Sequence, residues 1–182
     1  MVLNGEHGSA KSTTEKVLRR LIDPNKADLR SVPKDSRDLM IAATNGLVIA
    51  LDNLSHIPTW LSDALCRLAT GGGFSTRTLY ENDEETIFEA QRPIILNGIN
   101  EIVTRGDLLD RSLTITCPVI PETNRRTEEE FWREFDAVRP FILGALLDAV
   151  SHGLAHINDT VLNFMPRMAD FAVWAVATEP AL

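Results

Sequence analysis

The sequence predicts a three-layer α/β fold with a parallel central sheet, followed by a smaller helical part. Short apolar runs that end in a polar residue are typical of buried parallel strands, and they occur at residues 2–3, 47–51 and 94–96. Segments with helical spacing of apolar residues separate these runs, as parallel pairing requires. After residue 121 the pattern becomes helical. We therefore predict an α/β core over residues 1–121 and a helical lid over residues 122–182.

Composition narrows the class of protein. The 182 residues are 44% hydrophobic and 24% charged, which suits a folded chain with one sizeable core. The net charge of −8 excludes a global basic field for nucleic acid, so any DNA contact must be local. Cys66 and Cys117 lack CxxC spacing, and we interpret them as buried thiols of a cytoplasmic protein. We find no signal peptide and no apolar run long enough to span a bilayer, so no membrane partner is expected.

The first strand is followed by a glycine-containing loop and then by Lys-Ser-Thr at the start of a helix. Strand, loop and helix in this order are typical of a phosphate-binding P-loop, in which backbone N–H groups and the helix dipole hold an anion. Lys11 would reach the β- and γ-phosphates of a nucleotide, and the Ser12 hydroxyl would bind Mg²⁺. The expected nucleotide-binding residues are Gly5, Glu6, His7, Gly8, Ser9, Ala10, Lys11, Ser12 and Thr13.

Ala10 departs from the P-loop pattern, which has glycine at this position. We expect alanine to be tolerated if the residue is near helical geometry, because alanine loses freedom only at positive φ. A plainer interpretation stays open. Gly5 and Gly8 would then form an ordinary strand-to-helix turn, and Lys11 would be a solvated residue of the first helical turn.

Further elements follow from local pattern. We expect helices over residues 35–44 and 60–70, a short strand over residues 29–32, a further buried strand over residues 113–116, and a β-hairpin within residues 73–91. In the second part, Thr127 and Glu130 fit a capping box. Pro140 is expected near a junction between helices, and a last helix is expected after Pro166.

Two polar residues follow predicted buried strands, at the sheet edge where ligands bind in open α/β folds. Asp52 would be the second anchor of a metal bound to phosphate, and Asn97 would orient a water near the γ-phosphate. The local alternatives are that Asp52 caps the next turn and that Asn97 is a turn residue before Gly98.

In this order the motifs resemble those of AAA+ ATPases. Residues 5–13 resemble the Walker A motif, and residues 48–52 resemble Walker B. Asn97 stands where sensor 1 is expected, and residues 104–111 resemble the arginine-finger segment. The hairpin before Asn97 resembles the insertion of the pre-sensor-1 hairpin clade. The resemblance covers most of the chain. It is greatest to the ATPase modules of phage, plasmid and poxvirus-type primase-helicases related to superfamily 3.

This resemblance implies ATP and Mg²⁺ as cofactors, with Ser12 and Asp52 as metal ligands. It also implies that an arginine completes the ATP site of the adjacent subunit in a ring, usually a hexamer. Arg105 is our preferred finger and Arg111 the second candidate; Arg167 is a candidate sensor 2. Single-stranded DNA and a primase domain or another protein are the partners that the resemblance implies.

Two departures bear on activity. Walker B normally ends in two acidic residues, whereas here Asn53 follows Asp52, and an amide cannot act as a general base. Three alternatives are open. Asn53 only orients the attacking water, another acid such as Asp83 or Glu84 lies near the nucleotide, or hydrolysis is slow. The hairpin tip is acidic where DNA-translocating relatives tend to be basic or aromatic, which disfavours phosphate contacts.

We therefore expect an ATP-binding module that powers DNA unwinding or remodelling in phage- or plasmid-type replication. The alternatives are an ATP-dependent regulatory switch acting on a protein partner and a non-hydrolysing ATP-binding remnant. Because the first strand begins at residue 2, we also expect a module of a larger protein or a shortened one.

Overall fold

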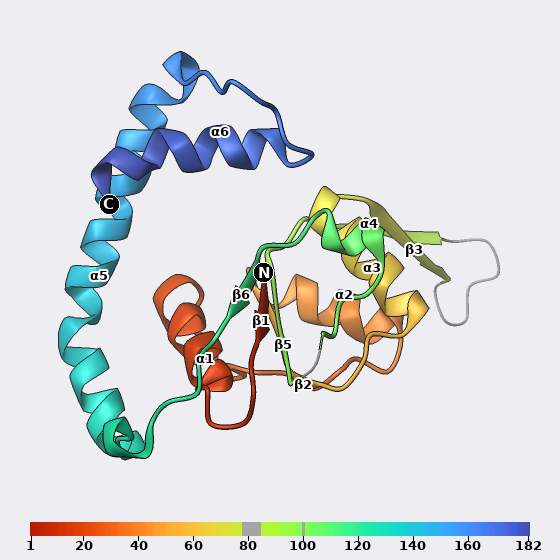
Figure 1. Cartoon of the computed structure of the whole chain (residues 1–182). Helices are drawn as coiled ribbons and strands as arrows, with labels where there is room; N and C mark the ends of the chain where they lie inside the picture. Colours follow the sequence, from red (N-terminus) through yellow and green to blue (C-terminus); the bar gives the residue numbers. More distant parts are fainter. Residues whose placement is uncertain (78–84, 100) are drawn as a thin grey trace. The chain divides into compact units, whose positions relative to one another are not determined.

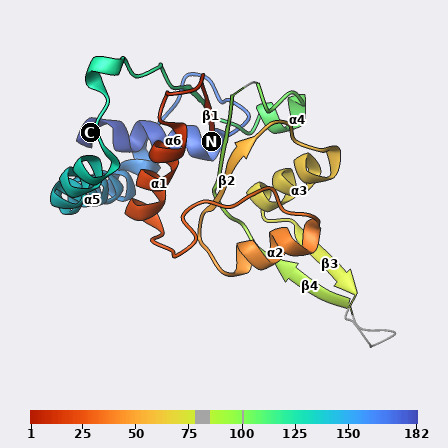
Figure 2. The ribbon, with the colours of Figure 1, turned by 90° about the horizontal axis from the view of Figure 1, so that it is seen from below.

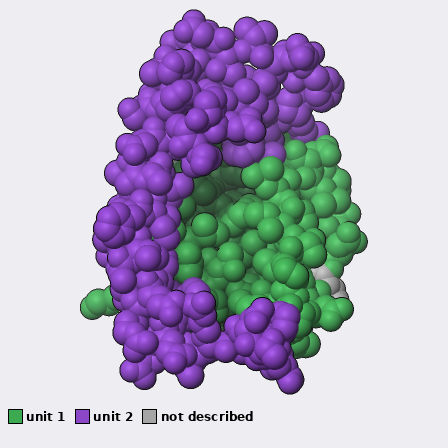
Figure 3. All heavy atoms as spheres, turned by 60° about the vertical axis from the view of Figure 1, so that its left-hand side comes forward, with its two compact units in different colours: residues 1–120 green, residues 121–182 purple. Residues whose placement is uncertain are grey.

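The structure is a computed structural model that describes residues 1–77, 85–99 and 101–182 of the chain. By its internal contacts the chain divides into two compact units, Met1–Ile120 and Pro121–Leu182, which Figure 3 colours separately. The division falls one residue from the expected boundary. That the second unit serves as a lid stays a prediction.

Unit 1 is a mixed α/β unit whose main sheet is parallel. Its elements are β1 (Val2–Asn4), α1 (Lys11–Ile22), α2 (Ser36–Thr44), β2 (Ile49–Leu54), α3 (Thr59–Thr70), β3 (Gly73–Arg77), β4 (Glu85–Glu89), β5 (Ile94–Gly98), α4 (Gly106–Leu109) and β6 (Thr114–Thr116) (Figure 1). The sheet has the order β2-β5-β1-β6. Strand β5, which carries Asn97, therefore lies between β1 and β2, and the carboxyl ends of all four strands share one edge.

Helices cover both faces of the sheet: α1 lies on one side, and α2 and α3 lie on the other (Figures 1 and 2). Alternate strand residues enter two separate cores, as the two-residue period of a strand requires. The core that includes buried residues of α2 and α3 contains Val2, Ile49, Leu51 and Leu96. The core that contacts Leu18 of α1 contains Leu3, Val48, Ala50 and Ile95. Since both faces of β1, β2 and β5 are buried, these strands begin as continuous apolar runs.

The hairpin expected within residues 73–91 is confirmed, with β3 paired antiparallel to β4 from Gly73↔Glu89 to Arg77↔Glu85. The expected strand at residues 29–32 is reduced to one bridge, in which the Arg30 N–H donates to the Ala50 carbonyl across 3.0 Å. Strand β2 continues through Asp52 to Leu54, and its register to β5 shifts between Leu51 and Leu54. Asp52 thus lies within an irregular strand, not just after one.

Two expectations of burial are wrong. Strand β6 is exposed throughout, with Ile115 47% accessible, because it ends the four-stranded order and its side chains belong to neither core. Cys66 and Cys117 are free thiols, but both are only partly buried.

Arg19 ties the end of α1 to the start of β2, which the sequence pattern did not indicate. Its side chain is 1% exposed and donates to the Asp23 carboxylate and to the Val48 carbonyl. Asp23 also accepts the Val48 N–H across 2.9 Å. Burial acts to raise the pKa of Asp23, but the hydrogen bonds from Val48 and Arg19 outweigh it and lower the pKa. A buried arginine is tolerable here because its charge is paired and hydrogen-bonded.

Unit 2 is helical. Its elements are η1 (Glu122–Asn124), α5 (Glu128–His156), η2 (Ile157–Asp159), α6 (Ala169–Thr178) and η3 (Glu179–Ala181). The capping box is confirmed: the Glu130 N–H donates to Thr127 Oγ1 and the Thr127 N–H donates to the Glu130 carboxylate. The expected junction at Pro140 is wrong, because α5 runs through it. Proline has no backbone N–H, so the helix lacks one hydrogen bond at Pro140, but its turns continue on both sides.

Helices α5 and α6 pack closely at Gly153. A Cβ at this position would lie 2.5 Å from Thr178 Cγ2, so only glycine permits the contact.

The segment Glu128–Asp159 is long and apolar enough to cross a membrane by length and composition. Its most apolar 18 residues have a mean hydropathy of 1.3, and 11% of them are buried. Core helices of soluble proteins and signal sequences pass the same test. The expectation that the chain has no such run is therefore wrong.

Candidate functional site

The loop between β1 and α1 turns sharply at two glycines. A Cβ on Gly5 would lie 2.6 Å from the Cys117 carbonyl oxygen and 2.7 Å from Ser9 Oγ, so the loop path requires glycine there. Gly8 has a φ of 79°, which glycine adopts without strain. Ser9 is buried and donates to the Glu6 carbonyl across 2.8 Å, which closes the turn.

Ala10 does not have the right-handed helical geometry that would make alanine harmless. It lies in the left-handed region at φ 54° and ψ 27°, directly before the first residue of α1. Its carbonyl accepts the Thr14 N–H across 2.8 Å, so the strained residue also starts the helical hydrogen bonds. Left-handed geometry costs a non-glycine residue about 1 kcal/mol. The alanine is accommodated, but at a conformational cost.

Lys11 folds back onto the loop that precedes it. Its Nζ donates to the Gly5 carbonyl at 2.8 Å, to the Glu6 carbonyl at 2.9 Å and to Ser9 Oγ at 3.2 Å. These neutral oxygens are acceptors that phosphate oxygens can replace. The ammonium is thus held by the loop itself, within reach of an anion bound there.

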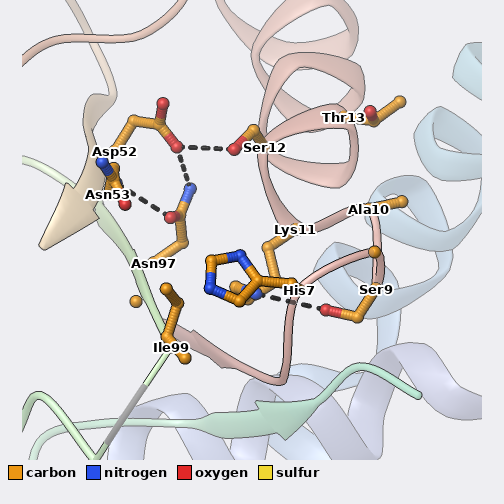
Figure 4. A pocket seen from close by; sticks show the side chains of 12 residues that line it. His7, Ser9, Ala10, Lys11, Ser12, Thr13, Asp52, Asn53, Asn97 and Ile99 are labelled. Atoms are coloured by element: carbon orange, nitrogen blue, oxygen red, sulfur yellow. Dashed lines mark hydrogen bonds between the residues drawn. The ribbon is translucent and has the colours of Figure 1, made fainter. Parts of the chain in front are cut away.

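Ser12, Asp52 and Asn97 come from α1, β2 and β5 and point toward one another (Figure 4). Ser12 Oγ donates to Asp52 Oδ1 across 2.7 Å, and Asn97 Nδ2 donates to the same oxygen across 2.6 Å. Asn97 is 2% exposed, whereas Asp52 is half-buried. The structure therefore brings together the two expected metal ligands and the expected water-orienting residue, although they are 40 or more positions apart.

Asn53 lies beside this group in a second left-handed conformation, with φ 57°. Its backbone N–H donates to Asn97 Oδ1 across 2.9 Å. Asparagine is one of the few residues that tolerate this region well. Its side chain is exposed and carries no carboxylate that could accept a proton. Of the alternatives considered for a base, Asp83 and Glu84 lie outside the described residues, as does the acidic hairpin tip.

Glu15 is a member of this network that sequence reasoning missed. It lies in α1 with no exposed surface, and its Oε2 accepts a hydrogen bond from Asn97 Nδ2. Burial raises the pKa of Glu15 to about 8, against the lowering effect of the Asn97 hydrogen bond and with a further rise from the Asp52 charge. The one available signal was its spacing: Glu15 lies three residues after Ser12, on the same side of the helix.

These residues surround an open cavity of about 390 Å³ at the carboxyl edge of the sheet. It is lined by His7, Gly8, Ser9, Ala10, Lys11, Ser12, Thr13, Asp52, Asn53, Asn97, Gly98 and Ile99. Gly5 and Glu6 belong to the same loop but do not line this cavity, and their carbonyls accept hydrogen bonds from Lys11. A second cavity of about 490 Å³, lined in part by Arg30, shares Asp52 and Asn53. Sequence reasoning did not single out Arg30.

Comparison with known families assigns the chain to a group of replication proteins. Residues 1–181 match the model of the family described as actinomycete integrative conjugative element replication protein. The chain belongs to this family. No curated protein matches it. The expectation of a role in DNA replication is thereby confirmed at the level of the family, while the match itself says nothing of ATP hydrolysis or unwinding.

In this replication protein Arg105 lies directly before α4 and Arg111 lies just after it, and neither lines the cavity. Arg105 Nη2 pairs with Asp63 and Asp107, each at 3.0 Å, and 41% of its side chain is exposed. The hydrogen bond from Arg105 lowers the pKa of Asp107. Arg111 is half-buried and donates to the Asp107 carbonyl across 2.7 Å. Arg105 is therefore the more accessible of the two to another molecule.

Arg167 belongs to unit 2, where it lies exposed just before α6. Its expected role at the nucleotide needs the arrangement of the two units, so that role stays a prediction.

Proposed function

We propose that this replication protein binds ATP with Mg²⁺ at residues 5–13 and hydrolyses it to drive unwinding or remodelling of DNA. The observation that carries the proposal is the pairing of Ser12 Oγ with Asp52 Oδ1 across 2.7 Å, at the cavity that the loop lines. A hydroxyl that begins a helix and a carboxylate from a neighbouring strand are the two protein ligands that a nucleotide-bound Mg²⁺ requires.

The donor set fits Mg²⁺. Both groups are oxygen donors, and Mg²⁺ is usually held by one or two protein ligands together with water and phosphate. No group of three His, Cys, Asp or Glu residues that could hold a metal by themselves occurs in the described ranges. When bound, Mg²⁺ would neutralise charge on the β- and γ-phosphates.

Three side chains at the site have definite parts in this proposal. Lys11 would exchange the Gly5 and Glu6 carbonyls for phosphate oxygens, so that its charge faces the nucleotide. Asn97 would orient the attacking water. ATP and water give ADP, inorganic phosphate and one proton; the proton passes to phosphate or solvent, because Asn53 has no carboxylate to accept it.

Arg105 would complete the site of an adjacent copy in a homo-oligomeric ring. Its exposed guanidinium is held by two carboxylates, which orient it but leave part of it accessible. An arginine from a neighbour stabilises charge on the transferred phosphoryl group. The ring, its hexameric size, a primase or other protein partner, cytoplasmic location and contact with single-stranded DNA all belong to the proposal.

A second candidate function is an ATP-dependent switch with slow or absent turnover. Asn53 favours it, because the acidic residue expected after Asp52 is replaced by an amide. An ATPase assay with and without single-stranded DNA, with solution mass measured in parallel, separates the two. DNA-stimulated turnover by an oligomer supports the motor; ATP binding without turnover supports the switch; absence of ATP binding contradicts both.

A further inference from the structure

Glu15 is a buried carboxyl group that the proposed mechanism does not use. It lies on α1, four residues after Lys11, with no exposed surface. The described residues that line the cavity do not include it, so it cannot contact a nucleotide or the attacking water directly. Its Oε1 has no hydrogen-bond partner within the described part of the chain. A buried polar atom in that state is costly, so the residue calls for a functional reason.

The contacts of Asn97 supply that reason. Its Nδ2 has two N–H bonds, and these donate to Glu15 Oε2 and to Asp52 Oδ1. Its Oδ1 accepts the Asn53 N–H. If the amide were reversed, its oxygen would face two carboxyl groups and its N–H bonds would face another N–H. The hydrogen-bonding inventory of an amide therefore allows one orientation only.

We propose that Glu15 is a positioning residue that holds the Asn97 amide in the orientation needed at the nucleotide. Glu15 binds one N–H from the buried side, so the amide can offer only the other N–H toward Asp52 and the cavity. The same restraint keeps Oδ1 on the Asn53 N–H and thereby holds Asn53 in its left-handed conformation. This inference rests on the proposed function for its catalytic consequence, but not for its geometry.

The test compares variants that keep or remove the acceptor. Glu15→Gln retains a carbonyl oxygen for Asn97, whereas Glu15→Met has similar volume and no such acceptor. We expect Glu15→Met to lower kcat for ATP about 10-fold to 100-fold with KM changed less than about 3-fold, because a lost transition-state contact lowers kcat. Glu15→Gln should restore kcat to within about 3-fold of the parent.

A double-mutant cycle with Asn97→Ala separates positioning from general stability. If Glu15 acts through Asn97, Glu15→Met has little further effect on kcat in the Asn97→Ala background. An equal loss of kcat in both backgrounds would overturn the proposal. Should Glu15→Met not fold, Glu15→Asp draws the carboxyl back from Asn97 and gives the same test.

A second readout does not depend on turnover. The Asn97 side-chain N–H resonances and the exchange rate of the Asn53 N–H report the hydrogen bonds directly by NMR. Glu15→Met should shift the Asn97 resonances and speed Asn53 exchange at least about 10-fold, and Glu15→Gln should change both far less. If wild-type protein has no ATPase activity, the motor fails while this readout still decides the role of Glu15. Unchanged Asn97 and Asn53 signals in Glu15→Met would overturn the inference.

Discussion

The Asn97 amide and the Asp52 carboxylate are joined by a hydrogen bond of 2.6 Å between two neighbouring parallel strands. Ser12 donates to the same oxygen from the start of α1. Asp52 Oδ1 therefore links three separate elements at the cavity.

Asp52→Asn should remove the Mg²⁺ dependence of ATP binding. The substitution keeps an oxygen for Ser12 and Asn97 but removes the negative charge that a divalent cation requires. We expect Mg²⁺ to tighten ATP binding by wild-type protein, and this gain to fall at least about 10-fold in the variant. Titration calorimetry with ATP, in Mg²⁺ and in EDTA, measures this gain for wild type and for the variant. Asp38→Asn, an exposed carboxylate of α2, is the control and should keep the full gain.

Ala10→Gly should stabilise the protein, by up to about 1 kcal/mol in the free energy of unfolding. Glycine relieves the left-handed strain at φ 54°, although it also raises the entropy of the unfolded chain. Ala145→Gly, at an exposed position inside α5, should instead destabilise by about 1 kcal/mol. Urea unfolding of both variants checks the contrast. Destabilisation of equal size at both positions would show that Ala10 is not strained.

Stability should fall as pH rises from about 4.5 to about 8 through the contribution of Glu15. Its pKa is about 8 in the folded protein and near 4.5 when the group is unburied. Between these values the folded state holds a proton that the unfolded state has lost, so each pH unit lowers the free energy of unfolding by at most about 1.4 kcal/mol. The difference in free energy of unfolding between wild type and Glu15→Gln, measured across this pH range, isolates the contribution of Glu15 titration. A difference that does not change with pH would contradict it.

Arg105→Ala should leave ATP affinity within about 3-fold of wild type and lower turnover at least about 100-fold. The reason is that Arg105 lies outside its own cavity, so its charge would act on a neighbour's nucleotide. Wild-type subunits mixed with the variant should lose activity out of proportion to their dilution. Arg37→Ala, on the exposed start of α2, is the control. If Arg105→Ala keeps full turnover and Arg111→Ala does not, the finger is Arg111.

The convergence at the sheet edge was predictable because parallel strands place their carboxyl ends together. Asp52 and Asn97 each follow an apolar run, and the Lys-Ser-Thr motif follows another, so their proximity needed only the α/β fold. The order of the strands was not predictable from pattern. That β5 lies between β1 and β2 gives Asn97 its central place in the network.

What the pattern missed depends on tertiary context. Glu15 and Arg19 are charged residues of an amphipathic helix and would ordinarily face solvent, yet both are buried where α1 meets the sheet. The left-handed geometry of Ala10 opposes the preference of alanine and is held by neighbouring residues. Pro140 was expected near a junction between helices, but α5 continues through it. For the two buried charges a tertiary contact outweighs a local preference, whereas α5 is exposed around Pro140 and continues there by its own backbone hydrogen bonds.

ATP binding by Lys11→Ala tests the central claim most directly. Titration calorimetry with Mg²⁺ and ATP, on wild-type and variant protein of equal thermal stability, is the measurement. If residues 5–13 bind phosphate, wild-type protein binds ATP and Lys11→Ala loses at least about 100-fold in affinity, because the loop then holds only its own carbonyls and no cation. Equal ATP affinity in the two proteins, or no binding by wild type, would contradict the account.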